Sequence, residues 1–186
     1  MHYLFERRLN MLDVELNALK DDDLQKEDLF DRLVDDYRIA IPELNWDKAK
    51  YEVKKERLTL DNAPAEFHVR HGEDYHYVVC TVPFSETDYI TDIFKMAAPS
   101  EGLSIKPKEI EYREYSHDKI EENDAEYERI KTNARKAAQT VDQQLDEFAA
   151  DAVEFNQVQL PAAVGEKIAQ EKSRRIAVLS RSHTTP

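Results

Sequence analysis

The first forty residues place apolar side chains at the spacing of an amphipathic helix. The spacings alternate between four and three residues, which puts on one helical face Phe5, Leu9, Leu12, Leu16 and Leu19. An acidic run at residues 21–23 interrupts the pattern, a second apolar set follows up to Tyr37, and Pro42 forces the chain out of helix. The segment therefore predicts a helical hairpin.

From about Lys48 to Tyr115 the apolar period changes from 3.6 residues to two. Tyr51 and Val53 alternate with charged residues in the first part, and two tyrosines alternate with His76 and Val78 in the second. The alternation predicts a small antiparallel sheet, and the chain as a whole is expected to have an α+β fold.

A glycine inside this region predicts a hairpin turn. Gly72, as the first central residue of a two-residue loop, suits a type II′ turn. In that register Arg70 faces Tyr75 and His68 faces Tyr77, so these four side chains share one polar face, opposite an apolar face that includes Cys80.

After Asp118 the helical period returns and persists to Pro161. The stripe comprises Tyr127, Ile130, Ala134, Ala137, Val141, Leu145, Phe148, Ala152 and Phe155. A helix over residues 121–156 is roughly 54 Å long at 1.5 Å per residue, which is more than a small sheet can cover. We expect one α+β domain over residues 1–160, followed by a short basic helix and tail over residues 161–186.

The excess length of this helix predicts that its stripe needs additional cover. Part of it is expected to pack on the N-terminal hairpin, and part on a second copy of the chain, through Tyr127, Val141, Leu145 and Phe148. A bundle within one chain is the competing outcome.

Composition and charge exclude several kinds of binding site and several classes of protein. The 186 residues carry a formal net charge of −13, and only residues 161–186 have a positive balance. Three widely separated glycines exclude the loops that cradle phosphates. The single Cys80 excludes an internal disulfide. Because no apolar run reaches the ~20 residues of a membrane span and no secretion signal precedes the first helix, we expect a cytoplasmic protein without membrane contact.

Two sets of residues are candidates for metal chemistry. His68, His71, His76 and Cys80 are dense in the sequence, but the hairpin sends His68 and His76 to opposite faces, so we expect no metal and no other cofactor. Glu52-Val53-Lys54 has the Glu-x-Lys spelling of restriction-type nucleases. Its alternation puts Glu52 and Lys54 on the solvent face, which favours a charge pair, and no catalytic residue is predicted.

The remaining candidate is an interaction face. An aromatic and cationic sheet face with Arg70, Tyr75 and Tyr77 could stack on nucleobases. The acidic balance of this segment opposes phosphate binding and favours cross-strand pairing. The candidate face therefore comprises His68, Arg70, Tyr75 and Tyr77, with Tyr127, Val141, Leu145 and Phe148 of the long helix.

Four stretches of the chain together resemble a known group of proteins. They are FDRLVDDYRIAIPEL at 30–44, VPFSETD at 82–88, IFKMAAPS at 93–100 and LDEFAADAVEFN at 145–156, followed by a short basic helix. They resemble the N-terminal region of largely uncharacterised bacterial proteins that often continue into a restriction-endonuclease-like domain and are associated with defence against phage. In those proteins the catalytic residues lie in the C-terminal domain. The resemblance therefore implies a sensing or accessory module without a catalytic residue of its own.

The leading hypothesis is a non-enzymatic interaction, sensing or regulatory module, accessory to a nuclease-type defence effector. Its expected partners are proteins, a nuclease and a second copy of the chain among them, with nucleic acid only at the basic C-terminal tail. Two alternatives stay open, an acidic mimic of nucleic acid that inhibits a DNA-binding partner and a metal-dependent nuclease that uses the Glu52 and Lys54 strand.

Overall fold

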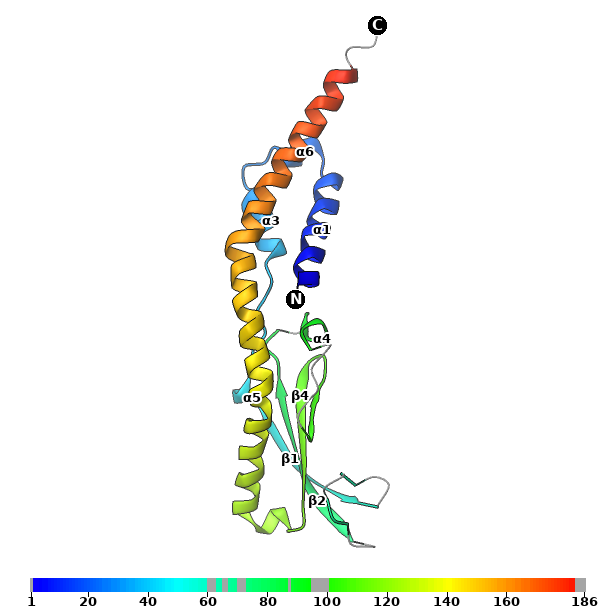
Figure 1. The fold of residues 1–186 in the computed structure, drawn as a ribbon, viewed down its shortest axis with the longest axis vertical. Helices are drawn as coiled ribbons and strands as arrows, with labels where there is room; N and C mark the ends of the chain where they lie inside the picture. Colours follow the sequence, from blue (N-terminus) through cyan, green and yellow to red (C-terminus); the bar gives the residue numbers. More distant parts are fainter. Residues whose placement is uncertain are drawn as a thin grey trace. The chain divides into compact units, whose positions relative to one another are not determined.

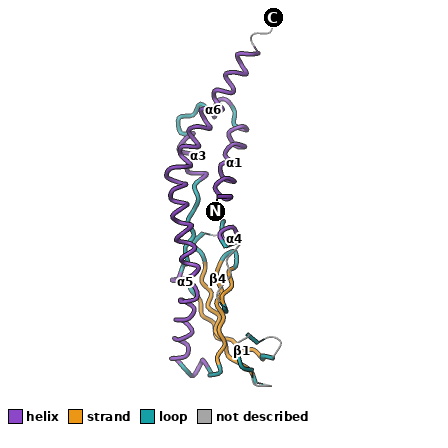
Figure 2. The backbone as a smooth tube through the Cα atoms, viewed as in Figure 1, coloured by secondary structure: helices purple, strands orange, loops and turns teal. Residues whose placement is uncertain are grey.

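The computed structural model describes residues 2–59, 63–64, 67–69, 73–86, 88–94 and 101–182. It has an α+β fold with a four-stranded antiparallel sheet and a long C-terminal helix (Figures 1 and 2), which confirms the predicted fold class. The chain forms two compact units, the first made of Met1–Ile41 and Phe148–Pro186 and the second of Pro42–Glu147. The sequence predicted one domain over residues 1–160, followed by a short basic helix and tail over residues 161–186, and this stays a prediction.

The first unit is helical. Its elements are α1 (His2–Ala18), α2 (Asp21–Leu24), α3 (Leu29–Tyr37), the end of α5 (Asp124–Glu154), the π-helical turn η3 (Phe155–Gln159) and α6 (Leu160–Ser182). The ring of Phe5 stacks on that of Phe155, with centroids 4.9 Å apart. Leu12, Leu33 and Leu160 are fully buried in the same unit. The predicted apolar face of the first helix is thus part of a core.

Polar side chains tie the segments of this unit together. The side-chain amide of Asn156 accepts a hydrogen bond from the Ile39 N–H at 2.8 Å and donates one to the Ile39 carbonyl at 2.9 Å. Arg175 donates to the carbonyl oxygens of Leu16 and Leu19, at 3.2 and 2.8 Å. These carbonyls belong to the last turn of α1 and the residue after it, where helical hydrogen bonding ends and the Leu16 carbonyl has only a long backbone bond of 3.4 Å from the Leu19 N–H.

The last helix is longer than the sequence predicted. Pro161 was expected to separate it from α5, but α6 contains 23 residues and begins one residue before the proline. Proline lacks an N–H, and its ring clashes with the carbonyl four residues earlier. The wider turn of η3 lies in front of Pro161 and gives that ring room, so the helical path continues.

The second unit contains the sheet, in the order β1-β2-β4-β3 with all pairs antiparallel. The strands are β1 (Lys50–Arg57), β2 (Asp74–Pro83), β3 (Leu103–Ile105) and β4 (Glu109–Ser116). Short helices complete it, namely η1 (Trp46–Lys48), α4 (Ile90–Ile93) and η2 (Ile120–Glu122). The antiparallel sheet predicted for this part of the chain is confirmed.

The predicted hairpin register is wrong. Tyr75 lies opposite Glu56, and Tyr77 lies between Lys54 on β1 and Tyr115 on β4. Residues 67–69 form no strand, and Arg70 lies outside the described residues. The run from Val78 to Val82 is almost continuously apolar, which is typical of a central strand with two neighbours rather than one arm of an isolated hairpin.

Helix α5 packs its apolar stripe on one face of the sheet. The core of this unit includes Val78, Cys80, Val82, Ile110, Ile130, Ala134, Ala138, Val141 and Leu145. Further along the stripe, Phe148, Ala152 and Phe155 are buried in the helical unit. The expectation that a second copy covers Val141, Leu145 and Phe148 is therefore wrong, because their cover comes from the same chain.

Candidate functional site

Strand β4 divides its side chains between two environments. Tyr112, Glu114 and Ser116 lie on the side of α5, whereas Arg113 and Tyr115 lie on the opposite face, as the two-residue period requires. Each set forms a distinct group of contacts. Between them, on the side away from β2, lies a pocket.

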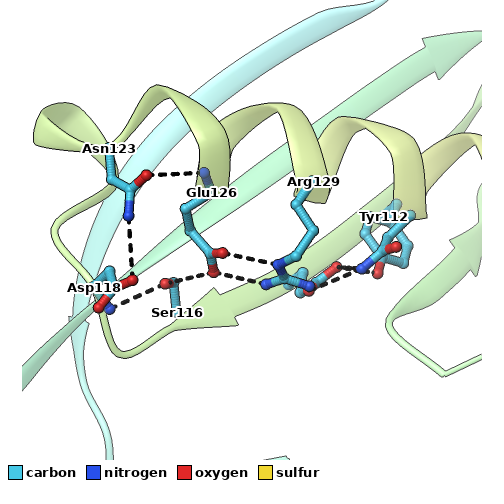
Figure 3. A network of polar contacts seen from close by, with 8 residues as sticks. Tyr112, Ser116, Asp118, Asn123, Glu126 and Arg129 are labelled. Carbon is cyan, nitrogen blue, oxygen red and sulfur yellow. Dashed lines mark hydrogen bonds and ion pairs between the residues drawn. The ribbon is translucent and has the colours of Figure 1, made fainter.

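On the α5 side, a polar network that includes Tyr112, Glu126 and Arg129 joins β4 to α5 (Figure 3). The Glu114 carboxylate is the centre of its β4 part. It accepts hydrogen bonds from the Tyr112 hydroxyl at 2.5 Å, from Arg129 at 2.6 Å and from the Asn133 amide at 3.1 Å. Burial, together with the bond to Glu114, raises the pKa of Tyr112. The carboxylate is thus held in place by one residue of its own strand and two of α5.

The network continues to the first turn of α5. Glu126 accepts two hydrogen bonds from Arg129, at 2.6 and 2.8 Å, and one from the Ser116 hydroxyl at 2.8 Å. The bonds from Arg129 lower the pKa of Glu126. The side chain of Asn123 accepts from the Glu126 N–H at 3.1 Å and so caps the helix. These contacts fix the start of α5 against β4.

On the opposite face, aromatic rings pack against one another. The Phe67 ring stacks on that of His117 with centroids 4.3 Å apart, and it meets Tyr75 edge-on at 5.1 Å. Tyr77 lies 4.9 Å from Tyr115. Tyr75 is only 3% exposed, so its ring is not available to stack on a nucleobase.

Tyr115 links this aromatic cluster to the edge strand β1. Its hydroxyl donates to the Glu56 carboxylate at 2.9 Å, and burial raises the pKa of Tyr115 together with that bond. The Arg113 guanidinium lies over the Tyr77 ring, 5.3 Å from its centroid. The interpretation of this face as cross-strand aromatic pairing is confirmed, with partners other than those the hairpin predicted.

The pocket lies where β3 stops covering β4. Strand β3 pairs as far as Leu103 with Tyr112, and the Arg113 N–H still donates to the Gly102 carbonyl at 2.8 Å. The backbone of Tyr115 points to the same side two residues later, and no strand of the described residues pairs with it there. The pocket has a volume of about 330 Å³ and is lined by Pro64, Phe67, Glu101, Gly102, Tyr112, Arg113, Glu114, Tyr115 and Asn133.

The structure does not gather the predicted interaction residues into one face. His68 is exposed in the connection between β1 and β2. Tyr127 is half-buried beside β1, 6.4 Å from the Tyr51 ring. Val141, Leu145 and Phe148 are core residues. Among the described residues of the predicted face, Tyr75 contacts the Phe67 ring and Tyr77 contacts the Tyr115 ring, and both Phe67 and Tyr115 line the pocket.

Glu52 and Lys54 form an exposed ion pair with an N–O distance of 2.8 Å. Its hydrogen bond with Lys54 lowers the pKa of Glu52, and the pKa of Lys54 rises for the same reason. Both side chains lie on the face of β1 away from α5. This matches the charge pair that the alternation favoured.

His76 and Cys80 both lie on the α5 side of β2 and are buried. The His76 Nδ1 is 3.3 Å from a Glu121 carboxylate oxygen, and burial raises the pKa of the Cys80 thiol. Within the described part of the chain, no group of three or more His, Cys, Asp or Glu side chains could hold a metal ion.

The basic residues of the last helix are largely paired inside the helical unit. Lys167 contacts Asp13 at 2.5 Å, and Glu171 accepts hydrogen bonds from Arg174 and Arg175. Arg175 also contacts Asp21 at 2.6 Å. These three cations therefore already have carboxylate partners within the unit, and the nucleic-acid contact expected at the C-terminal end stays a prediction.

Sequence reasoning missed Glu114 and the α5 residues that hold it. A signal was present, because Glu114 continues the inward-facing alternation of Ile110 and Tyr112 and so places a carboxylate where a partner is required. Arg129 and Asn133 are 15 and 19 residues away in the chain, so no local pattern identifies them as those partners.

No helix in the described ranges is long and apolar enough to cross a membrane. Comparisons of this chain with family models, with curated proteins and with solved structures give no match.

Proposed function

We propose that this chain is a non-enzymatic interaction module that binds an extended segment of a protein partner as an added strand on β4. The observation that carries the proposal is the edge of β4 beside the pocket, with which no strand of the described residues pairs. Unpaired backbone N–H and C=O groups at a sheet edge are a template for another strand, and neighbouring pockets select its side chains.

The other edge of the sheet is less suited to such pairing. Strand β1 has the sequence KYEVKKER, in which six of the eight residues are charged. Charged side chains on an edge strand oppose pairing with a further chain. The edge of β4 instead offers Tyr115 and Phe67 on one side and Glu114 with Asn133 on the other.

These two walls define the chemistry of the partner segment. Side chains of an added strand alternate between the two faces of the sheet. Those on the Phe67 side meet aromatic rings, which favour apolar residues, and those on the other side meet Glu114, with Glu101 also lining the pocket. The expected segment therefore alternates apolar and basic residues, which also suits a chain of net charge −13.

The resemblance noted in the sequence supports a nuclease-type defence effector as the source of this segment. A second copy of the chain is the other partner to test. Because the apolar stripe of α5 is buried, we expect self-association to use the β4 edge rather than the stripe.

The test is calorimetric titration of the full chain with the products of the genes next to its own. Asn133→Arg fills the pocket with a long cationic side chain and is expected to weaken binding at least tenfold. Thr132→Arg adds the same side chain at an exposed neighbouring position outside the pocket and should bind as the original chain does. Equal binding by all three proteins would refute the proposal, as would the absence of both a binding neighbour and a dimer in light scattering.

A further inference from the structure

A second group of residues lies on the other side of α5, where the helix meets β1 and η1. We call it the cationic aromatic patch, and it consists of Trp46, Tyr51, Tyr127, Lys131 and Arg135. The Lys131 ammonium lies 5.4 Å from the Tyr51 ring centroid and 5.2 Å from that of Tyr127. The Arg135 guanidinium lies 5.6 Å from the Trp46 centroid. Each ring of the patch therefore has a cation over it.

The charge balance here differs from that of the rest of the chain. Between Glu128 and Asp142, α5 contains four basic residues and no acidic one. Among the described residues, no carboxylate lies within ion-pair distance of Arg135, of its neighbour Lys136 or of Lys48, which shares the η1 turn with Trp46. Lys131 is paired with Glu128 at 2.8 Å, and η1 also contains Asp47. The other three cations still give this part of a protein of net charge −13 a local excess of positive charge.

From this arrangement we propose that the cationic aromatic patch binds single-stranded nucleic acid. A guanidinium over an indole uses its face for the ring, while the N–H groups at its edge can donate to phosphate oxygens as well as to the Tyr51 hydroxyl. Bases that are not in a duplex stack on aromatic rings and on arginine planes. The patch combines both elements, and it lies on a different edge of the sheet from the β4 pocket, so the proposal does not depend on the proposed function.

Two other ligands are less consistent with the patch. A duplex keeps its bases stacked inside and would use the cations alone. An acidic peptide would also pair with the cations but would make no use of the three rings, whose other contacts are with the core of the sheet unit. A ligand that supplies both a π-face and a negative charge can contact the half-buried rings and the cations over them at the same time.

Trp46 makes the test direct because it is the only tryptophan of the chain. The full chain is titrated with oligothymidylate of about ten nucleotides, within the range of ~4 to 16 that one small domain covers. We expect saturable quenching of Trp46 fluorescence. With about three phosphates neutralised, the logarithm of the affinity should fall against the logarithm of salt concentration with a slope of roughly −2.

Variants separate the contribution of charge from that of stacking. Arg135→Gln is expected to weaken binding about tenfold or more, whereas Lys108→Gln removes an equally unpaired, exposed lysine from the β3–β4 turn and should have almost no effect. Tyr127→Leu keeps an apolar side chain and the net charge but removes a ring. A loss of ~1 to 3 kcal/mol per stacked base corresponds to at least about fivefold weaker binding. Circular dichroism confirms that each variant is folded.

Several results would overturn the proposal. The first is the absence of quenching and of any anisotropy change with labelled oligonucleotide at low salt. The second is equal weakening by Arg135→Gln and Lys108→Gln, which would indicate unspecific attraction. The third is binding of polyglutamate or duplex DNA as tight as that of the single strand, which would indicate an anion site without stacking.

Discussion

Replacing Gly102 by alanine tests the point at which the edge of β4 becomes free. Gly102 has a φ of +74°, and an added Cβ would lie 2.5 Å from the Arg113 carbonyl oxygen. The left-handed conformation costs an alanine roughly 1 to 2 kcal/mol. Relief of the clash must also disturb the hydrogen bond from the Arg113 N–H to the Gly102 carbonyl, worth about 1 kcal/mol. Gly102→Ala should therefore lower the free energy of unfolding by about 2 to 3 kcal/mol.

Gly165→Ala is the matched substitution with the opposite sign. Gly165 lies inside α6, and an added Cβ would meet only the edge of the Phe30 ring, at 3.8 Å, which is ordinary van der Waals contact. Alanine is favoured over glycine in a helix interior by about 0.5 to 1 kcal/mol. The same change of residue is thus expected to stabilise the helical unit.

Urea unfolding measures both effects. Trp46 fluorescence follows the sheet unit, which contains the only tryptophan, and far-ultraviolet circular dichroism follows the helices. We expect a lower midpoint by fluorescence for Gly102→Ala and a higher midpoint by circular dichroism for Gly165→Ala. A Gly102→Ala variant as stable as the original chain would refute the positive φ and the close approach of β3 to β4. A destabilised Gly165→Ala would show that Phe30 lacks the space described.

Three further variants probe the core and two carboxyl groups with opposite shifts. Leu145→Ala should cost ~2 to 5 kcal/mol of stability because this side chain is buried, and an unchanged urea midpoint would place it outside the core. Burial, with repulsion from Asp146, raises the pKa of Asp142. The folded state then loses stability as pH rises through the range between the unfolded and folded pKa values of Asp142. Asp142→Asn should therefore stabilise the protein at neutral pH and lose this gain in acid. A gain that persists in acid would contradict burial and repulsion as its cause. Hydrogen bonds from Arg174 lower the pKa of Glu171 from 4.5 to about 2. The stability lost in Glu171→Gln should therefore be constant above about pH 5 and shrink as pH falls toward 2. A loss of stability that is independent of pH would rule out the ion pairs as its source.

Alternation along β2 was sufficient to predict the faces of the strand but not its neighbours. Tyr75 and Tyr77 do share a face opposite Val78 and Cys80, because that division depends only on the two-residue period. The neighbours depend on which strands compete for the two edges of β2. A two-residue turn at Gly72 is a local preference of modest energy, whereas placing β2 between β1 and β4 pairs the backbone on both sides of a largely apolar strand.

The candidate site was less predictable because it depends on distant pairs. Strand β3 has three residues and is shorter than β4, so part of the β4 edge extends beyond it. In the sequence, Gly102 marks the point where β3 begins. The partners of Glu114 follow from the register of α5 on the sheet, which no periodicity of the helix alone specifies. The same register carries Lys131 and Arg135 to the aromatic residues of β1 and η1.

The long helix shows where a sound premise led to a wrong conclusion. Its length does exceed what the sheet covers, since the apolar stripe continues through Phe148 and Phe155 into the helical unit. The inference of a second copy assumed that the first helix and a short last helix could not supply the rest of the cover. The last helix has 23 residues instead, and Phe5 stacks on Phe155. With the stripe buried within one chain, α5 contributes to the two proposed binding surfaces by positioning their residues rather than by offering its apolar stripe. The pocket that Asn133 lines and the patch that Arg135 completes are these two surfaces, on opposite sides of one helix.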